Sequence, residues 1–401
     1  MSKRTRILAA VMATMVMTTA FIGCKSEDKT TTDSGAKKSI TVWSHLMTPE
    51  VDKLREVAVA WGEKNNVDVK VVEDKGDMQA AITALQSSKG PDLYFGLAHD
   101  NLGTYNKANV LAEVPADFIK ASDYSSQGAV DAITIGGKQY AIPLSTECVA
   151  LFYNKDKVAT PAKSIEEVAA TKSFMYNATD FYVNFGFLSA NGGYVFKNNS
   201  GVLDTTDIGL GNEGAQKGYE FIRKMVLDDK LFAADITDDI AKAAFKAGTT
   251  SYYLTGPWNI ADCSAVNLGI APLPTLNGQA MKPFMGVQAA FVSAKSQNQD
   301  TAWELMKYLK DNTGDILIEQ GNRIPALKSA QASEKLKANK FADVFIKAAE
   351  VAIPMPNVPE VQAMWTPGAD NLKALIAGTQ DAKATAEKVA AQVKEGIAQQ
   401  K

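Results

Sequence analysis

Apolar residues in the first part of the chain alternate between runs typical of strands and spacings typical of helices. Runs rich in β-branched or aromatic residues occupy 39–44, 67–73 and 92–95. Each run is followed by a helix-like segment, marked by Val51, Leu54, Val57 and Trp61, by Met78, Ile82 and Leu85, and by the residues from Asn101 onward. Strands that alternate with helices pair in parallel, with the helices as crossovers. The pattern therefore predicts an α/β fold with a parallel sheet.

The rest of the chain continues in both patterns. Two β-like runs surround Gly136-Gly137 within 132–144, which predicts a hairpin. Further strands are predicted at 149–154, 250–256 and 283–294, and further helices at 213–229, at 300–311 and from Lys383 to the end. About 360 residues are left for folding after the N-terminal segment, more than one core usually serves, so we expect two domains.

The N-terminal segment has the order of a secretory signal. Lys3, Arg4 and Arg6 precede an apolar run, and a small residue, Gly23, ends it. The sequence Phe21-Ile22-Gly23-Cys24 resembles a bacterial lipobox, in which the cysteine is acylated and becomes the mature N-terminus. An ordinary signal followed by a chance cysteine is the alternative. We expect a signal peptide at 1–23 and a flexible tether at 24–37, because the residues after Cys24 are polar and without apolar periodicity.

Charge and cysteine content argue against several classes of function. The net charge is −3, and no block of basic residues lies beyond the signal, so a nucleic-acid partner has no electrostatic support. Cys148 and Cys263 are far apart in sequence, and they could pair or be buried as small hydrophobic residues. The chain has no CxxC pair and no His/Cys cluster. We expect neither a metal nor a cofactor.

Polar residues follow two of the predicted strands. In an open α/β sheet, ligands lie beyond the carboxyl ends of the strands. His45 follows the first strand, and His99 and Asp100 follow the third. Each histidine could instead be a hydrogen-bonded structural residue, and Asp100 could cap the helix that begins at Asn101.

Six segments in register resemble one known family. They are LAHDNLGTY (97–105), YAIPLSTECVALFYNKD (140–156), ANGGYVFK (190–197), AKAAFKAGTTSYYLTGPW (241–258), PFMGVQAAFVSAKS (283–296) and PMPNVPEVQAMW (354–365). Together they resemble the maltose/maltodextrin-binding group of solute receptors for ABC importers, from about Ile40 to the C-terminus. The resemblance implies a two-lobed periplasmic-binding-protein-like α/β fold with an interlobe hinge and a central ligand cleft. It implies an N-terminal lobe of 38–145 plus 290–325 and a C-terminal lobe of 146–289 plus 326–401.

The resemblance also implies the ligand-binding residues. The family's carboxylates match Asp100 and Glu147, its acid-aromatic cluster matches Asp180, Phe181 and Tyr182, and its stacking tryptophans match Trp258 and Trp365. These residue types suit a sugar, since aromatic rings cover the apolar faces of a pyranose and carboxylates accept bonds from its hydroxyls. Core packing is the alternative role for the two tryptophans.

Several positions depart from the family's pattern. The family's Asp-Lys pair after the first strand is replaced by a turn with His45, Met47 and Thr48. Its tryptophan before the Ala-His-Asp motif is Leu97, its arginine after the aspartate is Asn101, and an aromatic residue of the C-terminal lobe is Asp238. We expect His45 and Asn101 to contact the ligand. The altered contacts leave another oligosaccharide open as the ligand.

We therefore expect a receptor rather than an enzyme. The predicted protein is a monomer, lipid-anchored on the outer face of the cell membrane through Cys24, that binds malto-oligosaccharides and delivers them to the permease and ATPase of an ABC importer. A secreted glycoside hydrolase would need two carboxyls across one bond, for which Asp100 and Glu147 could be proposed. A polysaccharide adhesin is the third alternative.

Overall fold

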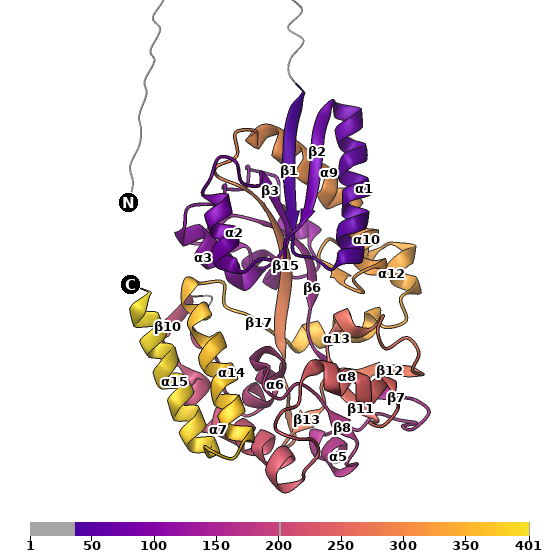
Figure 1. Ribbon diagram of the computed structural model, residues 1–401, viewed down its shortest axis with the longest axis vertical. Helices are drawn as coiled ribbons and strands as arrows, with labels where there is room; N and C mark the ends of the chain where they lie inside the picture. Colours follow the sequence, from indigo (N-terminus) through magenta and orange to yellow (C-terminus); the bar gives the residue numbers. More distant parts are fainter. Residues whose placement is uncertain (1–36, 200–201, 401) are drawn as a thin grey trace, which may run out of the picture. The chain divides into compact units, whose positions relative to one another are not determined.

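The first of two large sheets is built from the predicted strand–helix alternation at the N-terminal end. The computed structural model describes residues 37–199 and 202–400, so the predicted signal peptide, Cys24 and nearly all of the predicted tether lie outside the described residues. Strands β1 (Lys38–Ser44), β2 (Val67–Glu73) and β3 (Leu93–Ala98) lie parallel, in the order β3-β1-β2. Helices α1 (Thr48–Asn65), α2 (Met78–Leu85) and α3 (Leu102–Lys107) follow them (Figure 1). The prediction of parallel strands with crossover helices is confirmed for this part of the chain.

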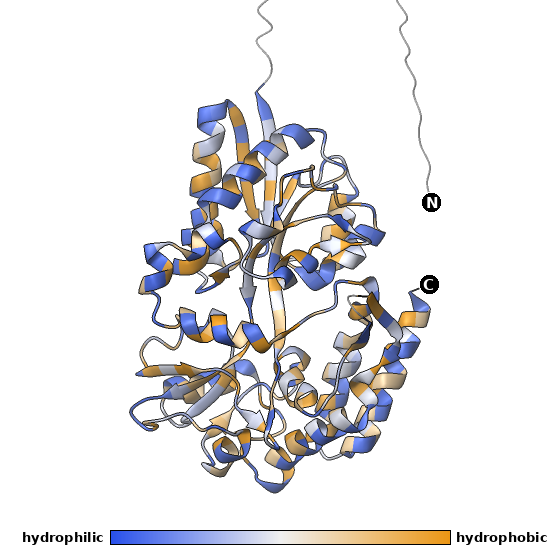
Figure 2. Ribbon diagram, turned by 180° about the vertical axis from the view of Figure 1, so that it is seen from behind, coloured by the Kyte–Doolittle hydropathy of each residue, from blue (hydrophilic) through white to orange (hydrophobic). Residues whose placement is uncertain are grey.

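Alternation of buried and exposed residues explains these elements. Along β2, Val67, Val69 and Val71 are buried and the residues between them are exposed. Helix α1 buries Val51, Leu54, Ala58 and Trp61 against the sheet, at the spacing of one helix face. Figure 2 shows the same division, with helices that carry one apolar and one polar side.

Strands β15 (Phe284–Val292) and β16 (Ile324–Pro325) of this sheet run antiparallel to β6 (Ile142–Glu147), which the sequence did not predict. Strand β15 pairs with β3 and with β6, and β16 pairs with β6, giving the order β16-β6-β15-β3-β1-β2. A short strand, β17 (Ile353–Pro354), pairs with the beginning of β15. The pattern that predicted parallel strands covers only β1, β2 and β3, whereas β15 and β16 come from distant sequence and not from a strand–helix–strand unit.

The second large sheet has four strands. Its order is β12 (Leu268–Ala271), β7 (Ala150–Asn154), β11 (Tyr252–Thr255) and β8 (Phe174–Met175), and only β11 and β8 are parallel. The helices packed on this part of the chain are α5 (Ile165–Ala170), α6 (Phe181–Ala190), α7 (Glu213–Arg223), α8 (Asp238–Lys246), α13 (Ala342–Val351), α14 (Gln362–Ile376) and α15 (Ala382–Gln399). Most strands and helices predicted after residue 149 are present within one or two residues of their expected bounds.

Two further groups of elements complete the fold. The predicted hairpin is confirmed as β4 (Thr134–Ile135) and β5 (Lys138–Gln139), with Gly136 and Gly137 at positive φ as a two-residue turn requires. The remaining elements are α4 (Gln127–Asp131), β9 (Phe196–Asn199), β10 (Val202–Ile208), a π-helical turn (Lys224–Asp228), β13 (Thr275–Leu276), β14 (Gln279–Ala280), α9 (Gln299–Asn312), α10 (Gly314–Glu319), α11 (Lys328–Gln331) and α12 (Glu334–Ala338). Within residues 37–199 and 202–400, no helix has both the length and the apolar character of a membrane span.

Two strands carry the chain from one hydrophobic core to the other. In β15, Phe284 belongs to the core around the four-stranded sheet, whereas Ala289 to Val292 belong to the core around β1, β2 and β3. In β6, Ile142 and Leu144 lie in the core around β1 to β3, and the residues just after β6, from Cys148, lie in the other. Cys148 and Cys263 are both buried, unpaired and part of the core around the four-stranded sheet. The residues at the centre of β6 and β15 therefore lie where the two cores meet (Figure 1).

Candidate functional site

The predicted His-Asp pair lies in a single 3-10 turn at the end of β3. This turn, η1 (His99–Asn101), has both His99 and Asp100 buried. The backbone N–H of Val287 donates to His99 Nδ1 at 3.0 Å, so Nε2 carries the proton and donates to the carbonyl of Met355 at 2.9 Å. Burial lowers the pKa of His99 to about 4, against the opposing effect of these two bonds. His99 is thus a neutral structural residue that joins β3, β15 and the segment before α14.

Asp100, although buried, is in contact with Gln362 of α14. Gln362 Nε2 donates to the Asp100 backbone carbonyl at 3.0 Å and reaches its Oδ2 at 3.5 Å, and Asn101 Nδ2 lies 3.3 Å from Oδ1. Burial raises the pKa of Asp100 to about 7, although the bonds from Gln362 and from the side chain of Trp365 oppose this. The prediction that Asp100 caps the next helix is wrong, because the turn begins one residue earlier and neither helical segment has a side-chain cap.

Glu147 ends β6 and has a donor on each carboxylate oxygen. Gln288 of β15 donates to Oε1 at 2.8 Å, and Arg323 Nη1 donates to Oε2. A Cβ on Gly286 would lie 3.1 Å from Glu147 Cγ and 3.5 Å from Tyr182 Oη, so the carboxylate and this phenol border the same backbone. The Glu147 side chain keeps 12% of its surface exposed. Each oxygen retains a lone pair that can accept a further bond.

Aromatic side chains of the core around the four-stranded sheet gather near these carboxylates. Tyr182, near the start of α6, lies 6.2 Å from Trp258 and 5.9 Å from Phe284 between ring centroids. Trp365 of α14 meets Phe284 and Phe181 edge-on, at 6.2 and 6.3 Å. Both tryptophans are only partly buried. Unlike Phe284, which is fully buried, they retain exposed ring surface for a ligand.

Asp180 is the N-cap residue of α6, the helix that carries Phe181 and Tyr182 of this cluster. Its Oδ1 accepts the backbone N–H groups of Tyr182 at 2.9 Å and Val183 at 3.3 Å, which caps the helix. Burial raises the pKa of Asp180, and the two N–H bonds oppose the shift. Sequence did not predict this capping role.

The other two predicted contacts have local partners. His45 is exposed, and its Nδ1 lies 3.0 Å from the carbonyl of Asp74. Asn101 Nδ2 donates to the carbonyl of Ala98 at 3.0 Å. Within the described part of the chain, no hydrogen bond or ring contact joins His45 to the aromatic cluster. Near the junction of the cores lie Asp100, Asn101, Glu147, Asp180, Tyr182, Trp258 and Trp365. His45 lies at the carboxyl end of β1, an interior strand, beside Asp74.

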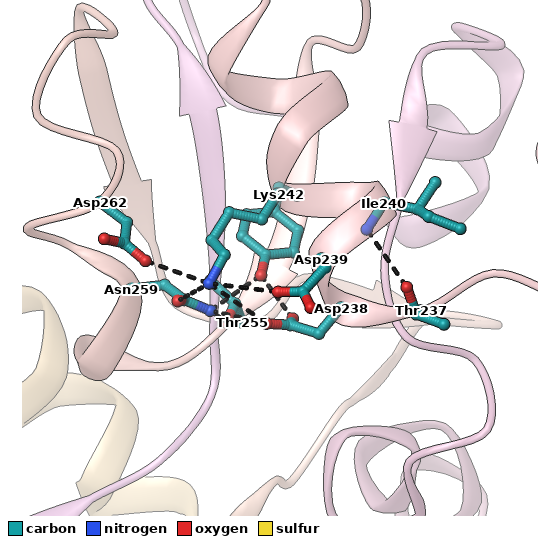
Figure 3. Close-up of polar contacts among 9 residues, drawn as sticks. Thr237, Asp238, Asp239, Ile240, Lys242, Thr255, Asn259 and Asp262 are labelled. Atoms are coloured by element: carbon teal, nitrogen blue, oxygen red, sulfur yellow. Dashed lines mark hydrogen bonds and ion pairs between the residues drawn. The ribbon is translucent and has the colours of Figure 1, made fainter. Parts of the chain in front are cut away.

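Asp238, which replaces the expected aromatic residue, belongs to a network of charged and polar side chains with Lys242, Asn259 and Asp262 (Figure 3). Asn259, next to Trp258, donates to Asp238 Oδ2 at 3.2 Å and accepts from Lys242 Nζ at 3.2 Å. Lys242 also pairs with Asp262 at 3.0 Å and lies near Asp239 at 3.7 Å. The hydroxyl of Thr237 caps α8, and the acidic residues of its first turn lie one helical turn before Lys242. The charge of Asp238 also helps to raise the pKa of Asp180, which indicates that the two carboxyls are near each other.

Several residues around the site were not found from sequence. Gln362, Gln288 and Arg323 bond to predicted residues, and Lys242 and Asn259 belong to the network of Asp238. Three of them, Gln288, Lys242 and Gln362, lie within the six family-like segments but were not singled out there. Gln362 lies three residues before Trp365, on the same side of a helix, and that spacing was an available signal. Arg323 and Gln288 had none, because their partners are distant in sequence.

A separate groove of about 650 Å³ lies between α14 and α15. Gln362 lines it, but no residue predicted to bind ligand does. Its walls are mainly Gln, Asn, Asp and Lys side chains, with no aromatic residue. This surface lacks the combination of rings and carboxylates found at the junction of the cores.

The chain belongs to a family of receptors. A sequence profile described as bacterial extracellular solute-binding protein matches residues 56–343, so the chain is a member of that family. Members of this class bind solutes, and the predicted resemblance to the maltose/maltodextrin-binding group is confirmed by the following relatives.

Three relatives are named for oligosaccharides. A maltodextrin-binding protein of Bacillus subtilis is 29% identical over 90% of each chain. A galactooligosaccharide-binding protein of the same organism is 28% identical over 97% of this chain and 96% of its own. A maltooligosaccharide ABC transporter solute-binding lipoprotein of Streptococcus pneumoniae is 26% identical over 100% and 99%. All three relatives are therefore named as oligosaccharide-binding proteins.

A solved structure shows the same fold. The maltose-maltodextrin binding protein of Alicyclobacillus acidocaldarius is 33% identical, covers 89% of this chain and 100% of its own, and superposes with a TM-score of 0.84. The predicted two-lobed α/β fold is confirmed. Each of the two sheets described above packs on a core of its own, as two lobes require.

Proposed function

We propose that the protein is a lipid-anchored receptor on the outer side of the cell membrane that binds malto-oligosaccharides and delivers them to an ABC importer. The observation that carries this proposal is the arrangement of Asp100 and Glu147 beside the partly exposed rings of Trp258 and Trp365. Rings stack on the apolar faces of a sugar, and carboxylates accept bonds from its hydroxyls. The names of two relatives, a maltodextrin-binding protein and a maltooligosaccharide lipoprotein, support the same ligand.

The proposed ligand cleft lies between a lobe of residues 38–145 plus 290–325 and a lobe of 146–289 plus 326–401. Asp100 would bind from the first lobe, and Asp180, Tyr182, Trp258 and Trp365 from the second, with Glu147 on the crossing strand. A sugar that contacts both sides favours the closed form by its difference in affinity for the two forms. The closed, monomeric receptor then docks on the permease, which releases the sugar as the lobes separate.

A different oligosaccharide is the second candidate ligand. The galactooligosaccharide-binding relative matches a larger share of this chain than the maltodextrin-binding one. Asp238, Leu97 and Asn101 replace residues expected of a maltose-type site. These changes would remove stacking and charged contacts on part of the ligand.

A thermal-shift panel tests the proposal. The panel holds α-glucans of two to seven units, galacto-, xylo- and manno-oligosaccharides and β-glucans, and calorimetry follows for each sugar that stabilises the protein. A ligand that binds only the native state raises its melting temperature in proportion to ln(1 + [L]/Kd). We expect the largest rise with malto-oligosaccharides. A larger rise with galacto-oligosaccharides favours the second candidate, and shortening of maltotetraose on incubation would overturn a receptor function.

The lipid anchor has its own test. We expect the wild-type protein to sediment with membranes and to incorporate labelled palmitate, and Cys24→Ser to do neither. Two acyl chains give stable anchoring where one is marginal. Labelling of the Cys24→Ser protein, or release of the wild-type protein into the medium, would contradict anchoring through this residue.

A further inference from the structure

A buried cluster behind the proposed ligand site joins three adjacent strands of the first sheet to α1. Glu147 ends β6, Gln288 lies in β15, and Arg323 immediately precedes β16. Because Ile324 pairs with Thr146, the antiparallel register places Arg323 opposite Glu147. The fourth member is Glu50, in the first turn of α1.

Arg323 binds both glutamates with different edges of its guanidinium. Nε and Nη2 donate to the two oxygens of Glu50, at 2.7 and 3.2 Å, while Nη1 donates to Glu147. Glu50 is 0% exposed and Arg323 is 6% exposed. Among the residues that the structure describes, Arg323 is the only buried lysine or arginine. Burial alone would lower the pKa of Arg323, but the charges of Glu147 and Glu50 raise it above its usual value.

The backbone at Gly321 passes too close to this cluster for a side chain to fit. A Cβ on Gly321 would lie 2.2 Å from Glu50 Oε1 and 2.9 Å from Arg323 Nε, so only glycine fits beside the ion pair. Glu50 Oε2 also accepts the backbone N–H of Met47 at 3.1 Å and thereby holds the turn after β1. One guanidinium thus fixes both that turn and the carboxylate of Glu147.

We propose that Arg323 is a positioning residue for ligand binding, which acts by orienting the carboxylate of Glu147 toward the ligand and by holding the turn at residues 45–48 through Glu50. The inference rests on the proposed function of Glu147 as a sugar contact. Arg323 itself does not touch the sugar. Its planar fork suits two carboxylates at fixed angles, which a lysine cannot reproduce.

A double-mutant cycle on ligand affinity tests this role. Arg323→Met, Glu147→Gln and the double variant are compared with the wild-type protein by calorimetry with maltotriose. We expect Arg323→Met to weaken binding roughly tenfold or more, as for loss of a charged hydrogen bond. In the Glu147→Gln background the same change should weaken binding less than about twofold, because the residue acts through Glu147.

Two further variants keep the test decisive. Lys335→Met removes an exposed ion pair with Glu319 on the same part of the chain, and we expect it to leave affinity unchanged. If Arg323→Met does not fold, Arg323→Lys replaces it in the cycle, and a smaller loss that again disappears in the Glu147→Gln background is expected. An equal loss of affinity in both backgrounds, or unchanged affinity in a folded Arg323→Met protein, overturns the proposal.

A crystal structure of the ligand-free variant separates this inference from the proposed function. If the wild-type protein binds no sugar of the panel, the proposed ligand class fails, whereas the positioning role is still read from the coordinates. In Arg323→Met, or in Arg323→Lys if the methionine variant does not fold, we expect Glu147 to rotate and lose its 2.8 Å bond with Gln288. Retention of that bond and of the wild-type carboxylate position would overturn the positioning role.

Discussion

At the scale of single residues, burial shifts the pKa values of two adjacent side chains, His99 and Asp100, in opposite directions. His99 and Asp100 share a buried turn, and burial disfavours the charged form of each. The pKa of His99 falls to about 4, while that of Asp100 rises to about 7. Two backbone groups form hydrogen bonds with His99. Asp100 is approached by Gln362 of α14 and by Asn101 of its own turn. The pair is therefore a structural histidine beside a candidate ligand contact.

The pH dependence of stability should separate the two residues. Between pH 4 and 6.5 an unfolded His99 takes up a proton that the folded protein excludes, so its contribution to stability falls as pH falls. Between pH 3.8 and 7 the folded Asp100 retains a proton that the unfolded chain releases, so its contribution falls as pH rises. In Asp100→Asn only the contribution of His99 remains, so the free energy of unfolding should rise with pH. In His99→Gln only that of Asp100 remains, so it should fall. Each slope is at most about 1.4 kcal/mol per pH unit. Urea unfolding from pH 4 to 7 measures both, and identical slopes in the two variants would contradict the assignment.

The exposed rings of Trp258 and Trp365 lead to a second prediction at this scale. Trp258→Ala and Trp365→Ala should each weaken sugar binding by about 1–3 kcal/mol, by analogy with base–aromatic stacking. Trp303→Phe is the control, since Trp303 is also partly buried but packs on Phe118, with 5.2 Å between ring centroids, against the core of the first sheet. Calorimetry of folded variants measures the change. Wild-type affinity in both alanine variants would remove stacking from the proposed site.

At the scale of elements, helix ends and strand ends place the candidate site. The 3-10 turn after β3 presents Asp100, the end of β6 presents Glu147, and the start of α6 presents Tyr182. Asp180 caps α6 with the same carboxylate that is proposed to meet the ligand. Local helix chemistry and ligand binding are therefore coupled at this residue.

Asp180→Ala should affect both stability and binding. Loss of an N-cap costs about 1 kcal/mol of folding free energy, and loss of the carboxylate should also weaken sugar binding. Asp381 caps α15 in the same way, with Oδ1 accepting from Ala384 N at 2.7 Å, but lies outside the proposed site. Asp381→Ala should lose similar stability and keep wild-type affinity. Chemical unfolding and calorimetry of both variants provide the comparison, and equal affinities in the two would argue against Asp180 as a ligand contact.

At the scale of the folded unit, two cores are joined by strands that belong to both. Strands β6 and β15 connect them, and Gln362 of α14 links the second lobe to the turn of Asp100 in the first. A hinge motion about the crossing strands is the movement that this connectivity favours.

Small-angle scattering should detect that motion. A saturating sugar should reduce the radius of gyration, and Gln362→Ala should increase the radius of the ligand-free protein, since it removes the 3.0 Å bond to Asp100. Gln399→Ala is the control, because Gln399 bonds only within α15, to Glu395. An unchanged radius in the presence of a sugar that calorimetry shows to be bound would contradict closure.

Local patterns in the sequence predicted much of this fold because strand and helix periodicity depend on neighbouring residues. Strand β2 has the predicted bounds, and the glycine pair at 136–137 forms the predicted turn. The identity of the aromatic and acidic residues, with the resemblance they carry, also led to the candidate site. Sequence failed where geometry depends on residues far apart, as with the antiparallel entry of β15. It also failed at a helix boundary, since the turn after β3 begins one residue before the position at which Asp100 would cap it.

The amino-acid sequence alone determined the class of fold, the order of its elements and the chemical types of side chain available to a ligand. Only the tertiary structure decided which of those side chains meet and in what state of charge. Arg323 reaches Glu50 and Glu147 across 273 and 176 residues of chain, and no local pattern records such a contact. Burial, which raises the pKa of Asp100 and lowers that of His99, likewise exists only once the two cores have formed.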